Sequence, residues 1–180
     1  MNKKISFLLI FCIASLLISC ATTPRNIDVT VTDPDRIRFQ GKGAGAGMML
    51  MSSMGAMGIA IGVAIDEGIG KDIDTTARAA ELNIQDIVVT AAKASELPVT
   101  GLTVERYGFV TRSGDDDPVA AQLHITVLQK DGTKRLVKYP EDFEAGIVII
   151  YPLEEVKRNG TLSTEAFKYA AKLALAVSAD

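Results

Sequence analysis

Residues 41–65 read GKGAGAGMMLMSSMGAMGIAIGVAI and combine the glycine content of a loop with the apolar content of a membrane-spanning segment. No charged residue occurs from Gly43 to Ile65, a run of 23 residues. As one helix rising 1.5 Å per residue, this run would be about 34 Å long, enough for the hydrocarbon layer of a bilayer. Each glycine weakens a water-exposed helix by about 1 kcal/mol, so we expect close packing to compensate.

Plotted at 100° per residue, the run has a smooth side of small residues opposite a bulky side that carries Leu50, Met57 and Ile61. Small residues at four-residue spacing let helix backbones approach closely, which is how helices associate in membranes. We therefore predict that the smooth side packs against another helix or contacts a membrane. The residues to which we assign this role are Gly43, Gly47, Ser52, Gly55, Ala56, Gly58, Ala60, Gly62 and Ala64.

The glycines of this run do not fit the common phosphate-binding patterns. The dinucleotide pattern needs a third glycine at the sixth position, which is Ala46 when counted from Gly41 and Met48 when counted from Gly43. A P-loop needs Ser or Thr after its lysine, whereas Gly43 follows Lys42. Three structures stay open: a helix or helical hairpin that enters, lies on or oligomerises at a membrane; a helix packed on the chain's own domain; or an irregular loop.

The N-terminus has the layout of an export signal. Two lysines in residues 1–4 precede an apolar run at 5–18, which small residues follow. This run of about 14 residues is shorter than the roughly 20 that a spanning helix needs. We therefore expect residues 1–19 to be removed as a signal peptide and residues 20–26 to form a lipidated tether, in which the six residues from Ala21 to Asn26 reach about 20 Å when fully extended.

Leu17-Ile18-Ser19-Cys20 resembles the lipobox of bacterial lipoproteins. The resemblance implies that Cys20 carries a diacylglyceryl group and an N-terminal acyl chain such as palmitate, which together give stable membrane anchoring. In that class an aspartate after the cysteine commonly retains the protein at the inner membrane. Because Ala21 stands there, the resemblance implies a periplasm-facing protein of the outer membrane. Residues 43–70 also resemble the glycine-zipper segments of small envelope lipoproteins, which implies a self-packing element near a membrane.

Charge and cysteine content exclude several classes of function. Without residues 1–19 the chain has 17 basic and 22 acidic side chains, a net charge of about −5, which argues against a nucleic-acid partner. Cys12 is expected to leave with the signal peptide, and the resemblance implies that Cys20 carries lipid, so we expect no thiol to be left for a disulfide, a redox motif or a zinc site. We expect no cofactor or metal apart from the covalent lipid.

The mature chain reads as a single α+β domain. We predict a small antiparallel sheet of about 4–5 strands with two flanking helices, plus the apolar helical segment. Asp131-Gly132 indicates a tight β-hairpin turn, and Ser163 is a suitable N-cap for the last helix. The expected units are a strand and turn at 27–40, the glycine-rich segment at 41–73 and the α+β domain at 74–180. The elements expected around them are strands at 27–31, 102–112, 119–129, 134–139 and 146–151 and a helix at 74–97.

No group of residues indicates a particular reaction. His124, the single histidine, lies on the polar side of its strand without a partner visible in the sequence. The acidic run 115–117 lacks the ligand spacing of a calcium loop and is interpreted as a solvated turn. The mixed charges just before residue 40 are interpreted as a solvated edge; they are Asp33, Asp35, Arg36 and Arg38.

The sequence thus predicts a non-enzymatic outer-membrane lipoprotein that acts as a binding or structural module. Its expected partners are membrane lipid through Cys20, an unidentified envelope protein and a second copy of the chain. The alternative is an accessory lipoprotein of a transport or secretion assembly that oligomerises through the glycine-rich segment.

Overall fold

The computed structural model describes residues 27–32, 35–95, 98–112 and 118–177. The expected signal peptide, Cys20 and its tether lie outside the described residues, as do Asp33 and the acidic run 115–117.

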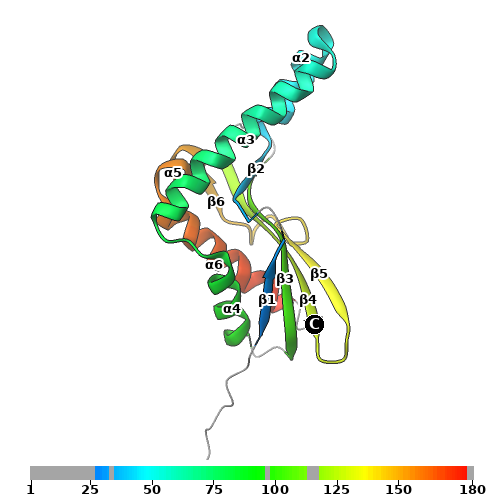
Figure 1. Ribbon diagram of the computed structural model, residues 1–180, viewed down its shortest axis with the longest axis vertical. Coiled ribbons are helices and arrows are strands. Elements are labelled where there is room, and N and C mark those ends of the chain that lie inside the picture. The colour runs from blue at the N-terminus through cyan, green and yellow to red at the C-terminus, as the bar shows by residue number, and fades with distance from the viewer. Residues whose placement is uncertain (1–26, 33–34, 96–97, 113–117, 178–180) are drawn as a thin grey trace, which may run out of the picture.

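Within the described residues, six strands form one sheet. Its centre is the antiparallel pair β3 (Val99–Thr111) and β4 (Pro118–Gln129). β1 (Asp28–Val31) and β2 (Arg38–Gln40) pair with successive stretches of β3, and β5 (Lys134–Tyr139) and β6 (Ile150–Pro152) pair with successive stretches of β4. The sheet is therefore long and narrow, with two short strands in line along each outer edge (Figure 1).

The α+β class and the helix-flanked sheet are confirmed, but the sheet is mixed rather than purely antiparallel. Both β1 and β2 run parallel to β3. The helices between β2 and β3 return the chain to its starting end, and parallel strands need such a long connection. The predicted turn at Asp131-Gly132 is confirmed: Gly132 has φ 87°, and the Asp131 carboxylate accepts a hydrogen bond from the Thr133 N–H at 2.9 Å.

The helix predicted at 74–97 is two helices that meet at a turn. α3 (Ala56–Ala79) ends where Glu81 adopts φ 58° and the Leu82 N–H reaches back to the Ala77 carbonyl at 3.0 Å. This arrangement is a Schellman motif, with glutamate in the position that glycine usually occupies. Asn83 then caps α4 (Ile84–Ala94) through its side chain. The apolar periodicity continues across the break because the end of α3 and the whole of α4 bury residues in the same core.

The strand predicted at 146–151 is a strand at its last two residues only; residues 146–147 lie in a turn and residues 148–149 have no regular structure. Only Ile150–Pro152 joins the sheet. The Ile147 N–H donates to the Glu144 carbonyl at 3.0 Å, and the Ile149 N–H donates to the Tyr139 hydroxyl at 3.3 Å. A short apolar run does not by itself identify a strand, and Ile147, Ile149 and Ile150 of this run are exposed rather than buried.

The chain ends in α5 (Leu153–Arg158) and α6 (Gly160–Val177). The predicted cap at Ser163 is wrong: Asn159 accepts hydrogen bonds from the Thr161 and Leu162 N–H groups at 3.1 and 3.3 Å. Ser163 lies one turn inside the helix, fully buried, and its hydroxyl has no hydrogen-bond partner. Asparagine and serine cap equally well, so the pattern alone does not decide between them.

The helices cover one face of the sheet, where the core lies (Figure 1). Phe167 of α6 is fully buried against Tyr107 and Phe109 of β3, with ring centroids 5.7 and 5.2 Å apart. α4 packs beside β1, where the Gln85 side chain donates to the Val29 carbonyl at 2.7 Å. The C-terminal half of α3 joins this core through Ile73 and other buried residues, so α3 is anchored in the domain.

The capping assignment predicts opposite outcomes for two substitutions in α6. Asn159→Ala leaves two N–H groups without a partner and should lower the free energy of unfolding by about 1 kcal/mol. Ser163→Ala removes a buried, unpartnered hydroxyl and should leave stability unchanged or raise it by about 1 kcal/mol. Urea unfolding of the two variants measures both effects, and a loss confined to Ser163→Ala would contradict the assignment.

Candidate interaction site on the helical hairpin

The glycine-rich segment is a helical hairpin that projects from one end of the domain (Figure 1). α2 (Lys42–Met54) runs outward and the first half of α3 returns beside it. The chain reverses at Gly55, whose φ of 58° favours glycine, and its N–H donates to the Met51 carbonyl at 2.9 Å. The segment therefore has the helical-hairpin shape that was one of the structures left open by the sequence, and its contact with a membrane or a second copy stays a prediction. The irregular loop and the single 34 Å helix are wrong.

Glycines bring the two arms into backbone contact. Gly43 and Gly47 of α2 are buried against Gly58 and Gly62 of α3. A methyl group on Gly43 would overlap the Gly62 carbonyl, and one on Gly62 would overlap the Gly43 carbonyl. Only residues without a side chain allow this approach. The other five small residues assigned to packing are exposed, and a membrane contact for them stays a prediction; they are Ser52, Gly55, Ala56, Ala60 and Ala64.

A carboxylate closes the base of the hairpin. Asp66 of α3 accepts hydrogen bonds from the N–H groups of Gly41 and Gly43 at 3.1 and 2.6 Å. These groups lie at the start of α2, where Gly41 has no side chain to act as a cap. A negative charge also interacts favourably with the N-terminus of a helix. Asp66 therefore binds the first turn of one arm to the other arm, across 25 residues of sequence.

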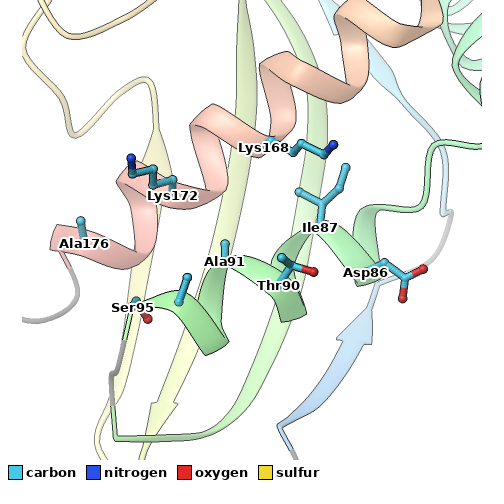
Figure 2. A pocket seen from close by; sticks show the side chains of 9 residues that line it. Asp86, Ile87, Thr90, Ala91, Ser95, Lys168, Lys172 and Ala176 are labelled. Carbon is cyan, nitrogen blue, oxygen red and sulfur yellow. The ribbon is translucent and has the colours of Figure 1, made fainter.

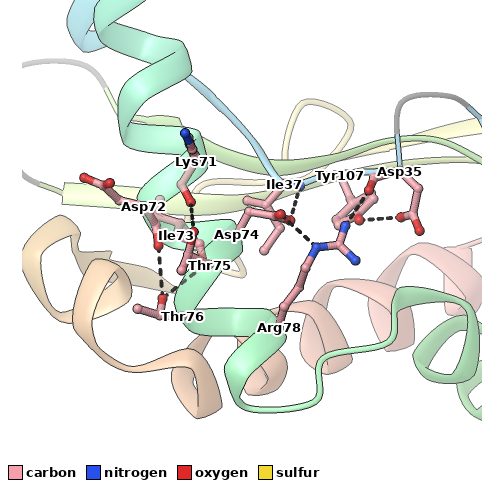
Figure 3. Close-up of polar contacts among 10 residues, drawn as sticks. All are labelled: Asp35, Ile37, Lys71, Asp72, Ile73, Asp74, Thr75, Thr76, Arg78 and Tyr107. Carbon is pink, nitrogen blue, oxygen red and sulfur yellow. Dashed lines mark hydrogen bonds and ion pairs between the residues drawn. The ribbon is translucent and has the colours of Figure 1, made fainter.

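A second polar network holds α3 to the segment before β2 (Figure 3). Asp74 accepts hydrogen bonds from the Ile37 N–H at 3.0 Å and from Arg78 Nε at 2.8 Å. The Arg78 guanidinium also donates to the Asp35 carbonyl oxygen, and the Tyr107 hydroxyl donates to the Asp35 carboxylate. Burial and this bond to Asp35 raise the pKa of Tyr107 well above its ordinary value.

Asp35 and Arg36 are exposed, as the interpretation of a solvated edge implies, but both also make contacts with other parts of the chain. Asp35 belongs to the network that anchors α3, and Arg36 forms an ion pair with Glu67 at 3.4 Å. Both contacts join residues that are more than 30 positions apart, so the local charge pattern did not reveal them.

Large apolar side chains cover the outside of the hairpin tip, which we define as residues 48–63. Met48, Met49 and Met57 are 75%, 81% and 63% exposed. Met48 and Met49 are consecutive, so they point about 100° apart around α2. The tip also exposes Met51, Met54, Ile59 and Val63. Soluble monomers rarely show such a continuous apolar surface, which usually marks a site of interaction. Among the described residues, no helix combines the length and hydropathy needed to cross a membrane.

A groove of about 520 Å³ lies between α4 and α6 (Figure 2). Ile87 and Ala91 of α4 and Ala176 of α6 line it, with Lys168 and Lys172 on the α6 side. Of the described buried polar atoms, the two without a hydrogen-bond partner belong to Arg106 and Ser163, outside this groove. The groove is thus a mostly apolar hollow with charged side chains of Asp86, Lys168 and Lys172 in its lining.

His124 has a carboxylate partner that sequence reasoning missed. Its Nε2 lies 3.1 Å from Glu141 Oε1, which also accepts a hydrogen bond from Gln122 at 2.7 Å. Burial acts to raise the pKa of Glu141, but hydrogen bonds from Gln122, its own backbone and His124 together lower it. Arg106 sits across from His124 in the sheet and donates to the Gln40 side chain at 3.2 Å. The turn after β5 brings Glu141 to this strand, and no sequence spacing signals it.

His124 is hydrogen-bonded to the Glu141 carboxylate, which is in turn bonded to the Gln122 amide. This group includes no hydroxyl or thiol to act as a nucleophile. In the part of the chain that the structure describes, no three His, Cys, Asp or Glu side chains are grouped to hold a metal ion. Comparisons with protein-family models, with curated proteins and with solved structures each found no match.

The glycine contacts predict a position-specific response to alanine. Gly62→Ala places a methyl group against the Gly43 carbonyl and forces the arms apart, so amide protection in α2 should fall by about 1–3 kcal/mol. Gly45→Ala is the matched control because its methyl group meets nothing within 4 Å, and it should stabilise α2 by up to about 1 kcal/mol. Hydrogen exchange measures both, and equal protection in the two variants would refute the contact.

The raised pKa of Tyr107 predicts a loss of stability at high pH. The folded state favours the neutral phenol, so this contribution is complete below the unfolded pKa of about 10 and is lost as the pH rises beyond it. Tyr107→Phe should be about 1–2 kcal/mol less stable at pH 8, because the bond to Asp35 is lost. It should then lose less stability than the parent between pH 8 and pH 11. Urea unfolding at both pH values tests this, and parallel losses would contradict it.

Proposed function

We propose that this chain is a non-enzymatic outer-membrane lipoprotein, anchored by acyl chains on Cys20. Its α+β domain acts as a binding or structural module and presents the helical hairpin as its contact element. The observation that carries this proposal is the apolar hairpin tip, with Met48 and Met49 largely exposed. The lipobox-like sequence ending at Cys20 supports the anchoring part.

The attachment of the hairpin to the domain supports its proposed role as the contact element. α3 continues without interruption from the tip into the core, where Ile73 and Ala77 are fully buried. Asp66 and Asp74 then bind its base to the segments around it. A rigid arm presents its apolar tip in a fixed direction, which lowers the entropy lost on binding.

The first described strand begins at the end of the sheet opposite the hairpin. β1 begins beside Gly101 at the start of β3, and β2 ends beside Val110 near the other end. The nine residue steps from Gly101 to Val110 span about 30 Å, and α2 extends about 20 Å farther. The hairpin projects from the end nearer β2 (Figure 1). The expected tether of about 20 Å is therefore too short to bring Cys20 to the tip.

The second candidate is an accessory lipoprotein of a transport or secretion assembly that oligomerises through the hairpin. Exposed apolar residues around the whole tip favour it, because copies in a ring contact neighbours on two sides. Discrete oligomers of the full chain in mild detergent, lost when Met49 and Met57 are replaced by aspartate, would distinguish it from the first candidate.

The anchoring part of the proposal is tested by Cys20→Ala in the full chain. This substitution should prevent labelling with radioactive palmitate and leave a precursor that retains residues 1–19. Cys12→Ala is the matched control, because Cys12 lies within the segment to be removed, and it should be labelled and processed like the parent. Normal processing of Cys20→Ala would rule out the lipoprotein assignment.

A further inference from the structure

We propose that the hairpin tip inserts into one leaflet of a lipid bilayer. This inference rests on the proposed role of the hairpin as the contact element, and it names the partner at that site. Three properties of the tip favour lipid over a protein surface: apolar residues are exposed on both helices, both serine hydroxyls and the N–H groups of Gly55 and Gly58 are bonded within the tip, and the charges lie at the base.

The exposed apolar residues point in several directions, which favours a surrounding lipid phase over a protein partner that covers one side. Met48 and Met49 point to different sides of α2, and Met57, Ile59 and Val63 extend the exposed surface along α3. A protein partner that covered one flank would leave the methionines of the other flank in water. A bilayer covers all of them together, and methionine side chains adapt to irregular surroundings.

Four polar groups of the tip form hydrogen bonds within the tip. The Ser52 and Ser53 hydroxyls donate to the Met49 and Leu50 carbonyls at 2.8 and 3.2 Å. At the reversal, the Gly55 N–H donates to Met51, and the Gly58 N–H donates to the Gly55 carbonyl at 3.0 Å. Internal bonding of this kind is required in hydrocarbon, where an unsatisfied backbone group is costly.

The length and charge pattern of the hairpin match a single leaflet. From Gly43 to Gly55 an arm is about 18 Å long, close to the roughly 15 Å of one hydrocarbon leaflet. The nearest charges on the two arms are Lys42 and Asp66, and they lie at the same level because Asp66 binds the Gly43 N–H. The charged base would therefore stay at the headgroups while the tip enters and leaves through the same leaflet.

A second copy of the chain is a weaker occupant. Close association of apolar helices uses smooth faces of small residues. The four buried glycines use one such face between the two arms of one chain. A second row of small residues, Ala56, Ala60 and Ala64, is exposed on α3, but the bulky exposed side chains of Met57, Ile59 and Val63 border it. The longest exposed side chains of the tip are those of its methionines. Such long side chains would keep the helices of two copies apart.

The chain contains no tryptophan, so a single introduced tryptophan reports on its own position. We would use residues 20–180 with Cys20→Ser, which keeps every described element because the first begins after Ile27. With vesicles of phosphatidylethanolamine and phosphatidylglycerol, Met49→Trp emission should shift to the blue and be quenched by lipids brominated on their acyl chains. Leu136→Trp is the control: this residue is 47% exposed on β5, and its emission should not change.

Charge substitution tests the same inference by flotation. An aspartate near the centre of a bilayer costs about 2.5–3.5 kcal/mol, so Met49→Asp should weaken vesicle binding by about 100-fold. Met57→Asp should act similarly, whereas Leu136→Asp and Ile150→Asp, at exposed positions of the sheet, should bind like the parent. Circular dichroism checks that each variant is folded, and binding should persist in about 0.5 M salt because it is apolar.

Unchanged Met49→Trp emission in the presence of vesicles would overturn the inference. A blue shift that appears without vesicles and grows with protein concentration would also overturn it, because the occupant would then be a second copy. These experiments use chains without the lipid, so their outcome is independent of Cys20 processing. Failure of lipid labelling would refute the anchoring proposal and leave tip insertion standing.

Discussion

The contact between Gly43 and Gly62 determines how the glycine-rich segment folds. Backbones approach so closely there that a single methyl group on either residue overlaps the other's carbonyl. Amphipathic helices usually bury their bulky apolar side and expose their polar side. In this hairpin the small residues form the buried contact, so Met48 and Met49 are left on the outside. The exposed apolar tip is thus a direct consequence of the glycine contact.

Two carboxylates connect the hairpin to the rest of the domain by hydrogen bonds. Asp66 replaces the missing cap at the start of α2, and Asp74 binds the backbone of Ile37 ahead of β2. Arg78 extends the second network to Asp35. Because both carboxylates belong to α3, this helix joins the tip, the edge of the sheet and the core, and the direction of the hairpin is determined by the fold.

Features that depend on nearby residues were predictable from the sequence, and features that depend on distant ones were not. The turn at Asp131-Gly132, the alternating first strand and the α+β class follow from local patterns. The parallel pairing of β1 and β2 was missed because it depends on the path of the intervening helices. The cap at Asn159 was missed because Ser163 has similar capping strength. The reversal at Gly55 was one of several outcomes that a glycine-rich run allows, and the contact of Asp66 with Gly41 joins residues far apart in sequence.

The placement of β1 and β2 in line along β3 has a mechanical consequence. A pull between the chain ahead of Ile27 and the tip at Gly55 acts along the length of β3, since β1 lies at one end of it and β2 near the other. The hydrogen bonds of both pairs cross this direction, so tension loads them in shear and several must break together. Peeling a strand from its end would break them one at a time. The sheet therefore resists most strongly a force that pulls its two ends apart, because that force loads both strand pairs in shear.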